Sequence, residues 1–429
     1  MRTIAFAIIL VILPFTAFSA DWQITTLENG LDVMILEYHQ VPQVNISTTI
    51  SVGAKNETSF FDGATHLLEH LILYRGTENM TGGEVGMAMS KHGAYFNGYT
   101  SSDWTDFVIS LPSENLEFAL QIHADMLFRS NFSEEEMNKE RQAIVEEINI
   151  RLDNPRRSAY WTMFKKLFEG HAYERNILGP KENILNIPRD SVYAYYKRYY
   201  APNNMTMVIV GDIDAGYTLE LVKRYFADFP PGEKTTDLVG RIKKRKEVSR
   251  IILKRDITQA YLMMSMVGAP SDSPDQYALN LIATMLGNGK SSRLWKTLRD
   301  ELGIVYSCTF NFSTYKYEGP IYAYAVLEPD KIGSTEEAIK QILIDVKTSG
   351  FTEQELRKAK NTIKTNYYTG HERGLDIADS YAQYDSFIGY EFIQNYPDNV
   401  EKVTLADIQA AAQKYLNTDS YVLTTVVPK

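Results

Sequence analysis

The strongest constraint on the fold is an internal repeat, because the chain passes twice through the same succession of strand-like and helix-like segments. Strand-like runs at residues 41–54 and 257–269 both end in Gly-Ala, and each leads through an aspartate into a helix-like stretch. Phe-Ser-Glu at residues 132–134 matches Phe-Thr-Glu at residues 351–353. A length of 429 residues also suits two domains or more. We therefore expect two similar domains, at residues 20–230 and 247–429, joined by a linker at residues 231–246.

The first copy carries a short run of chemical groups, His66-Leu67-Leu68-Glu69-His70, inside an apolar stretch that indicates a buried helix. On a helix, His66, Glu69 and His70 share one face. Two imidazoles one turn apart can bind a single Zn²⁺, with the carboxylate beside the open coordination position. His-x-x-Glu-His is the inverzincin signature. The alternative is a core helix with two buried histidines, but the chain has only seven histidines, so this spacing favours a metal site.

A third zinc ligand is expected elsewhere, because a catalytic zinc usually has three protein ligands and a water. The best segment is 133–148, where Ser133 and the acids after it indicate a helix start. Glu140 and Glu147 are seven residues apart and share a face, whereas Glu146 is turned by about a hundred degrees. Solvated surface explains most acids here, so Glu147 with Glu140 is our candidate pair. The predicted buried stripe beside them is Ala143, Ile144 and Ile148.

The second copy lacks these groups. In the register of the repeat, apolar residues take the positions of His66, Glu69 and His70, and uncharged residues take those of the two glutamates. We therefore expect one zinc per chain, in the first half. The residues at the five positions are Leu279, Ile282, Ala283, Ala359 and Asn366.

The runs 66–70 and 139–148 together resemble the insulinase/pitrilysin family of zinc peptidases, which includes the mitochondrial processing peptidases. The resemblance covers almost the whole chain after residue 20. Two positions depart from the family pattern, since Gly98 stands where Ala is usual and Thr65 where Ala is common. Further matching runs are Asn-Gly-Tyr-Thr-Ser at 97–101, Ile-Leu-Gly-Pro at 177–180, residues 200–205, residues 286–294 and residues 298–306.

The resemblance implies the roles of five residues in the first half. His66, His70 and Glu147 would be the zinc ligands, and Glu69 would be the general base. Glu140 matches the family's auxiliary catalytic carboxylate. The resemblance also replaces the parallel sheet that alternating strands and helices would suggest. Its implied fold is α+β, with two homologous domains that are each a mostly antiparallel sheet covered by helices.

The resemblance also implies residues that contact substrate. Asn97, Gly98 and Tyr99 would lie on an edge strand to which substrate adds as a further strand, recognised through its main chain. A plain hairpin edge is the alternative for this segment. Arg299 and Tyr306 match an Arg/Tyr pair that reaches the active site from across the chamber, where the tyrosine hydroxyl would stabilise the developing oxyanion.

The N-terminus predicts export. Arg2, an apolar run from Ile4 to Phe15 and a small-x-small site at residues 17–19 are typical of a cleaved signal peptide at residues 1–19. An uncleaved anchor is the alternative, although the apolar run is short for a membrane span. We expect a periplasmic or secreted protein. Its single cysteine, Cys308, excludes an intramolecular disulfide.

These features predict an exported zinc endopeptidase that hydrolyses short unfolded peptides in an enclosed chamber. A net charge of −10 argues against nucleic acid as a partner, and no stable membrane insertion is expected after signal removal. The family implies that two chains close face to face, as a homodimer or as a heterodimer with a homologous chain. The alternative function is a non-catalytic scaffold or partner subunit of a peptidase complex.

Overall fold

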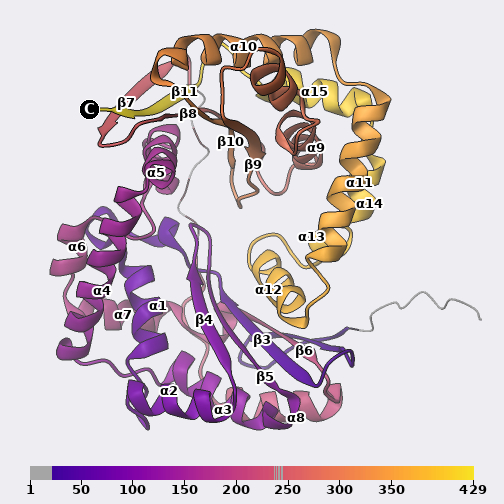
Figure 1. Cartoon of the computed structure of the whole chain (residues 1–429). Coiled ribbons are helices and arrows are strands. Elements are labelled where there is room, and N and C mark those ends of the chain that lie inside the picture. The colour runs from indigo at the N-terminus through magenta and orange to yellow at the C-terminus, as the bar shows by residue number, and fades with distance from the viewer. Residues whose placement is uncertain (1–21, 236, 238, 240–241, 243–244) are drawn as a thin grey trace, which may run out of the picture.

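The computed structural model describes residues 22–235, 237, 239, 242 and 245–429 (Figure 1). The predicted signal peptide at residues 1–19 lies outside these residues, as does part of the predicted linker. Within the described chain, no helix combines the length and the apolar character needed to span a membrane.

The N-terminal half is built on a six-stranded sheet in the order β1-β2-β6-β3-β5-β4. Every pair of neighbours is antiparallel except β2 and β6, which run parallel. β3 and β6 are buried along almost their whole length because the sheet is covered on both faces. The strands are β1 (Gln23–Thr26), β2 (Asp32–Glu37), β3 (Gln43–Ile50), β4 (Tyr95–Thr100), β5 (Thr105–Pro112) and β6 (Met205–Gly211).

The C-terminal half repeats this sheet with five strands in the order β7-β11-β8-β10-β9. β7 and β11 form its one parallel pair among the described strands, in the place of β2 and β6. The repeat and the α+β fold class predicted from the sequence are therefore confirmed, while the domain boundaries stay a prediction. The strands are β7 (Ser249–Arg255), β8 (Ala260–Val267), β9 (Ser307–Phe312), β10 (Pro320–Leu327) and β11 (Val422–Pro428).

Helices of each half cover the outer face of its own sheet, and the main cores lie in between (Figure 1). In the N-terminal half these are α1 (Ala64–Tyr74), α2 (Gly82–Lys91), α3 (Leu116–Phe128), α4 (Glu134–Asp153), α6 (Lys181–Asn186), α7 (Arg189–Tyr199) and α8 (Ala215–Phe226). In the C-terminal half they are α9 (Asp275–Gly287), α10 (Ile332–Ser349), α11 (Glu353–Thr369), α14 (Tyr396–Lys402) and α15 (Leu405–Tyr415). The short α13 (Glu391–Gln394) instead packs against α12 (Gly374–Asp385) and α14.

Two further helices cross between the halves and cover the inner sheet faces. α5 (Pro155–Leu167) follows α4 in the N-terminal half but packs on β8 and β11 of the other half. α12 (Gly374–Asp385) follows α11 and packs on β3 and β6 in return (Figure 1). Asn154 caps α5 through the Arg157 amide, and Pro155 takes the first turn, where its missing N–H costs nothing. Each half therefore completes the fold of the other.

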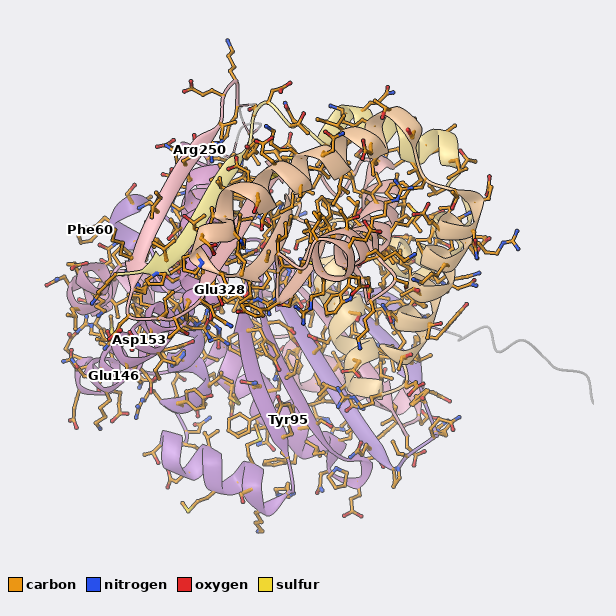
Figure 2. The ribbon with its side chains drawn as sticks, turned by 45° about the horizontal axis from the view of Figure 1, so that its top comes forward. Phe60, Tyr95, Glu146, Asp153, Arg250 and Glu328 are labelled. Carbon is orange, nitrogen blue, oxygen red and sulfur yellow. The ribbon has the colours of Figure 1, made fainter. Side chains whose placement is uncertain are left out.

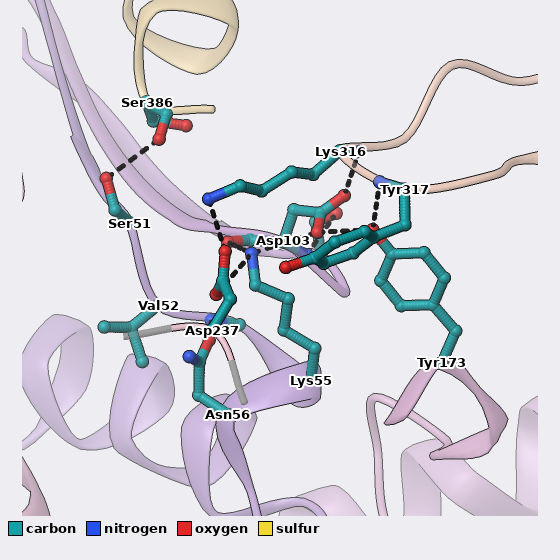
Figure 3. A network of polar contacts seen from close by, with 12 residues as sticks. Ser51, Val52, Lys55, Asn56, Asp103, Tyr173, Asp237, Lys316, Tyr317 and Ser386 are labelled. Carbon is teal, nitrogen blue, oxygen red and sulfur yellow. Dashed lines mark hydrogen bonds and ion pairs between the residues drawn. The ribbon is translucent and has the colours of Figure 1, made fainter. Parts of the chain in front are cut away.

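A buried polar network also joins the halves beside the linker (Figure 3). Lys55 Nζ, which is almost fully buried, donates to Oδ1 of Asp103 at 3.0 Å and lies 3.7 Å from Oδ1 of Asp237 in the linker. Tyr173 donates to the same Asp103 oxygen at 2.7 Å. On the other side, the backbone N–H of Lys316, between β9 and β10, donates to Asp103 Oδ2 at 3.0 Å. Buried charges need such partners, so the network favours one relative placement of the halves.

Candidate active site

Helix α1 carries the predicted cluster, and a carboxylate from the preceding turn holds the start of this helix. Gly63 precedes the helix with φ +94°, a conformation that favours glycine. The backbone N–H groups of Gly63 and Thr65 donate to the two Glu57 oxygens at 2.8 and 2.7 Å. Burial raises the Glu57 pKa to about 8, although these bonds oppose the shift. No sequence pattern predicted the role of Glu57, because this residue lies before the helix and outside its periodic positions.

α4 brings Glu147 to the same place. Donor atoms of His66, Glu69 and His70 lie within 4.8 Å of one another. Glu147 Oε2 lies 3.7 Å from His66 Nε2 and 3.8 Å from His70 Nε2. Glu146 is exposed on the outside of the molecule (Figure 2).

The predicted stripe on α4 is only partly right. Ile144 and Ile148 are buried, but Ala143 is exposed, so its placement in the stripe was wrong. The helix buries a narrower set of positions that continues through Met137, Glu140 and Ile144, and Ala143 is turned about a hundred degrees from Ile144.

Further side chains hold the cluster. His70 Nδ1 lies 2.9 Å from Glu140 Oε2, so its N–H donates to that carboxylate and leaves Nε2 facing Glu147. Arg75, just after α1, donates from Nε to the other Glu140 oxygen at 2.6 Å. Arg151 donates to Glu147 Oε1 at 2.6 Å. Glu140 therefore acts on the cluster through His70. Arg151 could have been found from its spacing of four residues after Glu147.

Burial and neighbouring charges set the protonation of the cluster. Burial, with the charges of His70 and Arg151, lowers the His66 pKa well below its usual value. Burial raises the Glu69 pKa to about 7. For His70, burial lowers the pKa, but the hydrogen bond to Glu140 and three nearby carboxylates outweigh it and raise the value. These are the directions without a metal ion.

The donor set fits zinc. The inward atoms, Nε2 of His66 and His70 and Oε2 of Glu147, face one another at distances too long for hydrogen bonds. The outward atoms of His70 and Glu147 are already held by Glu140 and Arg151. Two imidazoles and one carboxylate are a ligand set of catalytic zinc sites.

The predicted substrate strand is β4, at the free edge of the N-terminal sheet. Asn97 Oδ1 accepts the Gly98 N–H at 2.9 Å, and its amide donates to the hydroxyls of Tyr95 and Tyr99 at 3.2 and 3.3 Å. On the opposite face of β4, the Thr100 hydroxyl donates to Glu69 Oε2 at 2.5 Å. The edge strand therefore lies directly against the glutamate of the motif.

Arg299 and Tyr306 lie in the C-terminal half, and their hydrogen bonds go to other residues of that half. Arg299 donates to the carbonyl of Val305 at 3.1 Å, and the exposed Tyr306 hydroxyl donates to Glu328, which raises the Tyr306 pKa. Figure 2 labels Glu328 in that half. Among the described residues, no hydrogen bond or ion pair joins Arg299 or Tyr306 to the cluster.

Comparison with models of known protein families shows which family this chain belongs to. The family model described as Insulinase (Peptidase family M16) matches residues 33–181, which include the whole cluster. The model described as Peptidase M16 inactive domain matches residues 186–363. Together they cover most of the chain. The chain belongs to the insulinase family.

Two similar proteins match nearly the full length of this chain. An uncharacterized zinc protease of Rickettsia felis is 27% identical over 386 residues, covering 89% of this chain and 92% of its own. An uncharacterized zinc protease of Bacillus subtilis is 25% identical over 404 residues, covering 94% and 97%.

Solved structures confirm the two-domain fold of this family. A protease from Helicobacter pylori superposes with a TM-score of 0.90 at 24% identity, over 95% of this chain and 100% of that one. The periplasmic protease PqqL from Escherichia coli superposes with a TM-score of 0.77 at 21% identity, over 96% of this chain and 48% of that one. At such identities the likeness concerns the fold.

Proposed function

We propose that this insulinase-family chain is a zinc-dependent endopeptidase with one zinc site, held by His66, His70 and Glu147. The observation that carries the proposal is the convergence of two imidazoles on one carboxylate. Nε2 of His66 and Nε2 of His70 lie 3.7 and 3.8 Å from Glu147 Oε2, and Glu69 lies beside them. A scaffold protein has no need to keep these buried polar groups together, since burying them is costly.

The residues divide the work of hydrolysis. Zinc in such a site supplies Lewis acidity, which polarises the scissile carbonyl and makes water a nucleophile near neutral pH. Glu69 takes the proton of the attacking water and delivers it to the leaving amine. Glu140 orients His70, and Arg151 orients Glu147.

The substrates are short unfolded peptides that bind to β4. A peptide can add to the free edge through main-chain hydrogen bonds, which requires an extended segment. Binding would displace the Asn97 side chain from the Gly98 N–H. The signal-like N-terminus supports export to the periplasm or the extracellular space.

The proposed active site is composite. In the described part of the chain, Arg299 and Tyr306 bond to Val305 and Glu328 and not to the cluster, which supports a dimer in which each chain supplies this pair to the zinc site of the other. This chain also matches about half of PqqL, which fits an assembly of two such lengths. The partner would be a second copy or a homologous chain.

The first test is hydrolysis of a random peptide library by the purified, zinc-loaded protein, with and without a chelator. We expect cleavage that the chelator abolishes and added zinc restores. Absence of cleavage by a fully zinc-loaded protein would favour the alternative, a non-catalytic partner subunit.

Mixing variants tests the composite site. Glu69→Gln and Tyr306→Phe proteins should each be poor enzymes, because each lacks one half of the chemistry. After chain exchange, one site of a mixed dimer carries both lesions and the other carries none. Random exchange of equal amounts makes about half of the dimers mixed, so the mixture should regain about a quarter of the wild-type activity. Exchange shown by size-exclusion of tagged chains, without recovery, would place Tyr306 outside the partner's site.

A further inference from the structure

The edge strand β4 does more than offer its edge to a peptide. We propose that Thr100 is the positioning residue for the general base, holding Glu69 in the orientation that serves a peptide bound along the same strand. The inference rests on the proposed function, because it assigns a residue to the orientation of that base.

Thr100 makes the hydrogen bond that holds the Glu69 carboxylate. The Glu69 side chain is 5% exposed, and its Oε2 accepts the Thr100 hydroxyl at 2.5 Å. Among the described residues, Glu69 receives no other hydrogen bond. The other carboxylate oxygen, Oε1, accepts no hydrogen bond from these residues. Oε1 is therefore the atom available to take a proton from water.

The backbone of β4 at Gly98 also packs against the Glu69 side chain. A Cβ at Gly98 would lie 2.9 Å from Glu69 Cγ, 3.1 Å from Oε1 and 2.8 Å from a methyl of Leu73. The glutamate therefore lies against the Gly98 backbone, two residues from Thr100 on the same face of the strand. One strand thus sets both the place of the peptide and the direction of the carboxylate.

The consequence is a coupling between substrate register and base orientation. A glutamate side chain has three rotatable bonds, and without a bond to Oε2 its carboxylate would sample several directions. Positioning of reacting groups contributes strongly to catalysis, because small misplacements are costly. The Thr100 hydroxyl should therefore affect turnover more than substrate binding.

The test compares Thr100→Val, which keeps the branched shape and loses the donor, with Thr100→Ser, which keeps the hydroxyl. We expect kcat of Thr100→Val to fall about 10- to 100-fold, the size typical of a lost hydrogen bond to a charged group, with KM and zinc content nearly unchanged. Thr100→Ser should retain most of the activity. Equal losses in both variants, or no loss in Thr100→Val, would overturn the proposal.

Two further readouts separate this inference from the proposed function. In the Glu69→Gln background, Thr100→Val should cause no further loss, because the group it positions is gone, whereas additive losses would count against it. Crystal structures of the zinc-loaded proteins do not depend on activity. They should show one Glu69 rotamer in wild type and Thr100→Ser and a rotated or spread carboxylate in Thr100→Val. An unchanged rotamer would overturn the inference even if no peptide is ever cleaved.

Discussion

The two halves of the chain share one sheet order and differ in what their helices carry. In the N-terminal half, α1 and α4 meet through a polar cluster. Hydrogen bonds from or to further polar groups hold every member except the first, and the members are His66, Glu69, His70, Glu140 and Glu147. In the C-terminal half, α9 and α11 meet at the same positions through residues that need no such partners. The residues are Leu279, Ile282, Ala283 and Ala359, all buried, and Asn366, which is exposed.

The difference extends to the residues that support the cluster. The counterpart of Arg151, which holds Glu147, is Gly370, at the end of α11. A buried polar group is costly unless it is bonded, so a half without the proposed metal ligands has no use for their partners. The comparison teaches that the fold itself requires only the apolar packing, which supports the proposal that the polar cluster serves chemistry.

The two crossing helices, α5 and α12, also differ in the polarity of their contacts with the sheets. Apolar and aromatic side chains form the contact between α5 and the C-terminal sheet, among them Met163 and Phe164 of α5 and Met263 of β8. α12 also has an apolar centre, but Asp379 hydrogen-bonds with Asp106 of β5 under it. One inner sheet face is therefore covered by a nearly apolar interface and the other by an interface that contains carboxyl groups.

The largest expected contrast concerns Glu69 and its counterpart Ile282. Glu69→Gln should leave zinc and fold intact and reduce peptide hydrolysis by about 100- to 10,000-fold, because the amide cannot accept a proton. Ile282→Val should cost about 0.5–1.5 kcal/mol of stability, with little effect on kcat. Steady-state kinetics and denaturant unfolding would measure both. Near wild-type hydrolysis by zinc-loaded Glu69→Gln would remove Glu69 from the mechanism.

Next comes zinc affinity. Glu147→Ala, like His66→Ala or His70→Ala, should weaken binding by at least about 10- to 100-fold, since losing even the partners of ligands typically costs that much. Asn366→Ala, at the matching position of the other half, should bind zinc as wild type does. Competition with a chromogenic chelator gives the affinities. If Glu146→Ala empties the site and Glu147→Ala does not, the assignment of the third ligand fails.

The sequence predicted the helical cluster and the repeat because both depend on local spacing. His66, Glu69 and His70 needed only the helical period, and the same period separated Glu147 from Glu146. Residues brought together from distant elements left no local signal. Arg75, which lies 65 residues before Glu140 in the chain, is an example. Glu57 lies only six residues before Gly63, but the turn that brings it to the start of α1 follows no helical or strand period.

The crossing of α5 and α12 could not be predicted for a related reason. An amphipathic pattern tells which face of a helix is buried, and it does not tell which sheet buries that face. The repeat was visible in the sequence, while the exchange of covering helices depends on how the two copies pack together.

A smaller effect is expected for Arg151, the cation that the C-terminal half lacks. Arg151→Met should lower zinc affinity about 10-fold, because Glu147 loses the partner that fixes its carboxylate. Arg157→Met, on the exposed part of α5, is the matched control and should change nothing. Isothermal titration at several salt concentrations would compare them. An unchanged affinity for Arg151→Met would show that Glu147 is oriented by its helix alone.

The last contrast concerns the two crossing helices, and it should appear as a dependence of stability on pH. Burial and the hydrogen bond with Asp106 raise the Asp379 pKa to about 9, with Asp376 adding to the shift and Gln383 opposing it. Because the folded-state pKa lies above the unfolded value, the folded state holds a proton that the unfolded chain releases. Stability is then greatest below about pH 4 for this group and falls as the pH rises towards 9, by at most about 1.4 kcal/mol per pH unit.

Asp379→Asn should flatten this dependence, since the amide stays neutral at every pH and can still donate to Asp106. Glu57 and Asp385, whose pKa values are also raised, would keep their share of the slope in both proteins, so the difference between variant and wild type isolates Asp379. Denaturant unfolding between pH 5 and 9 measures it. A wild-type slope retained in Asp379→Asn would mean that the α12 interface holds no proton there. The two crossing helices would then be alike in their response to pH.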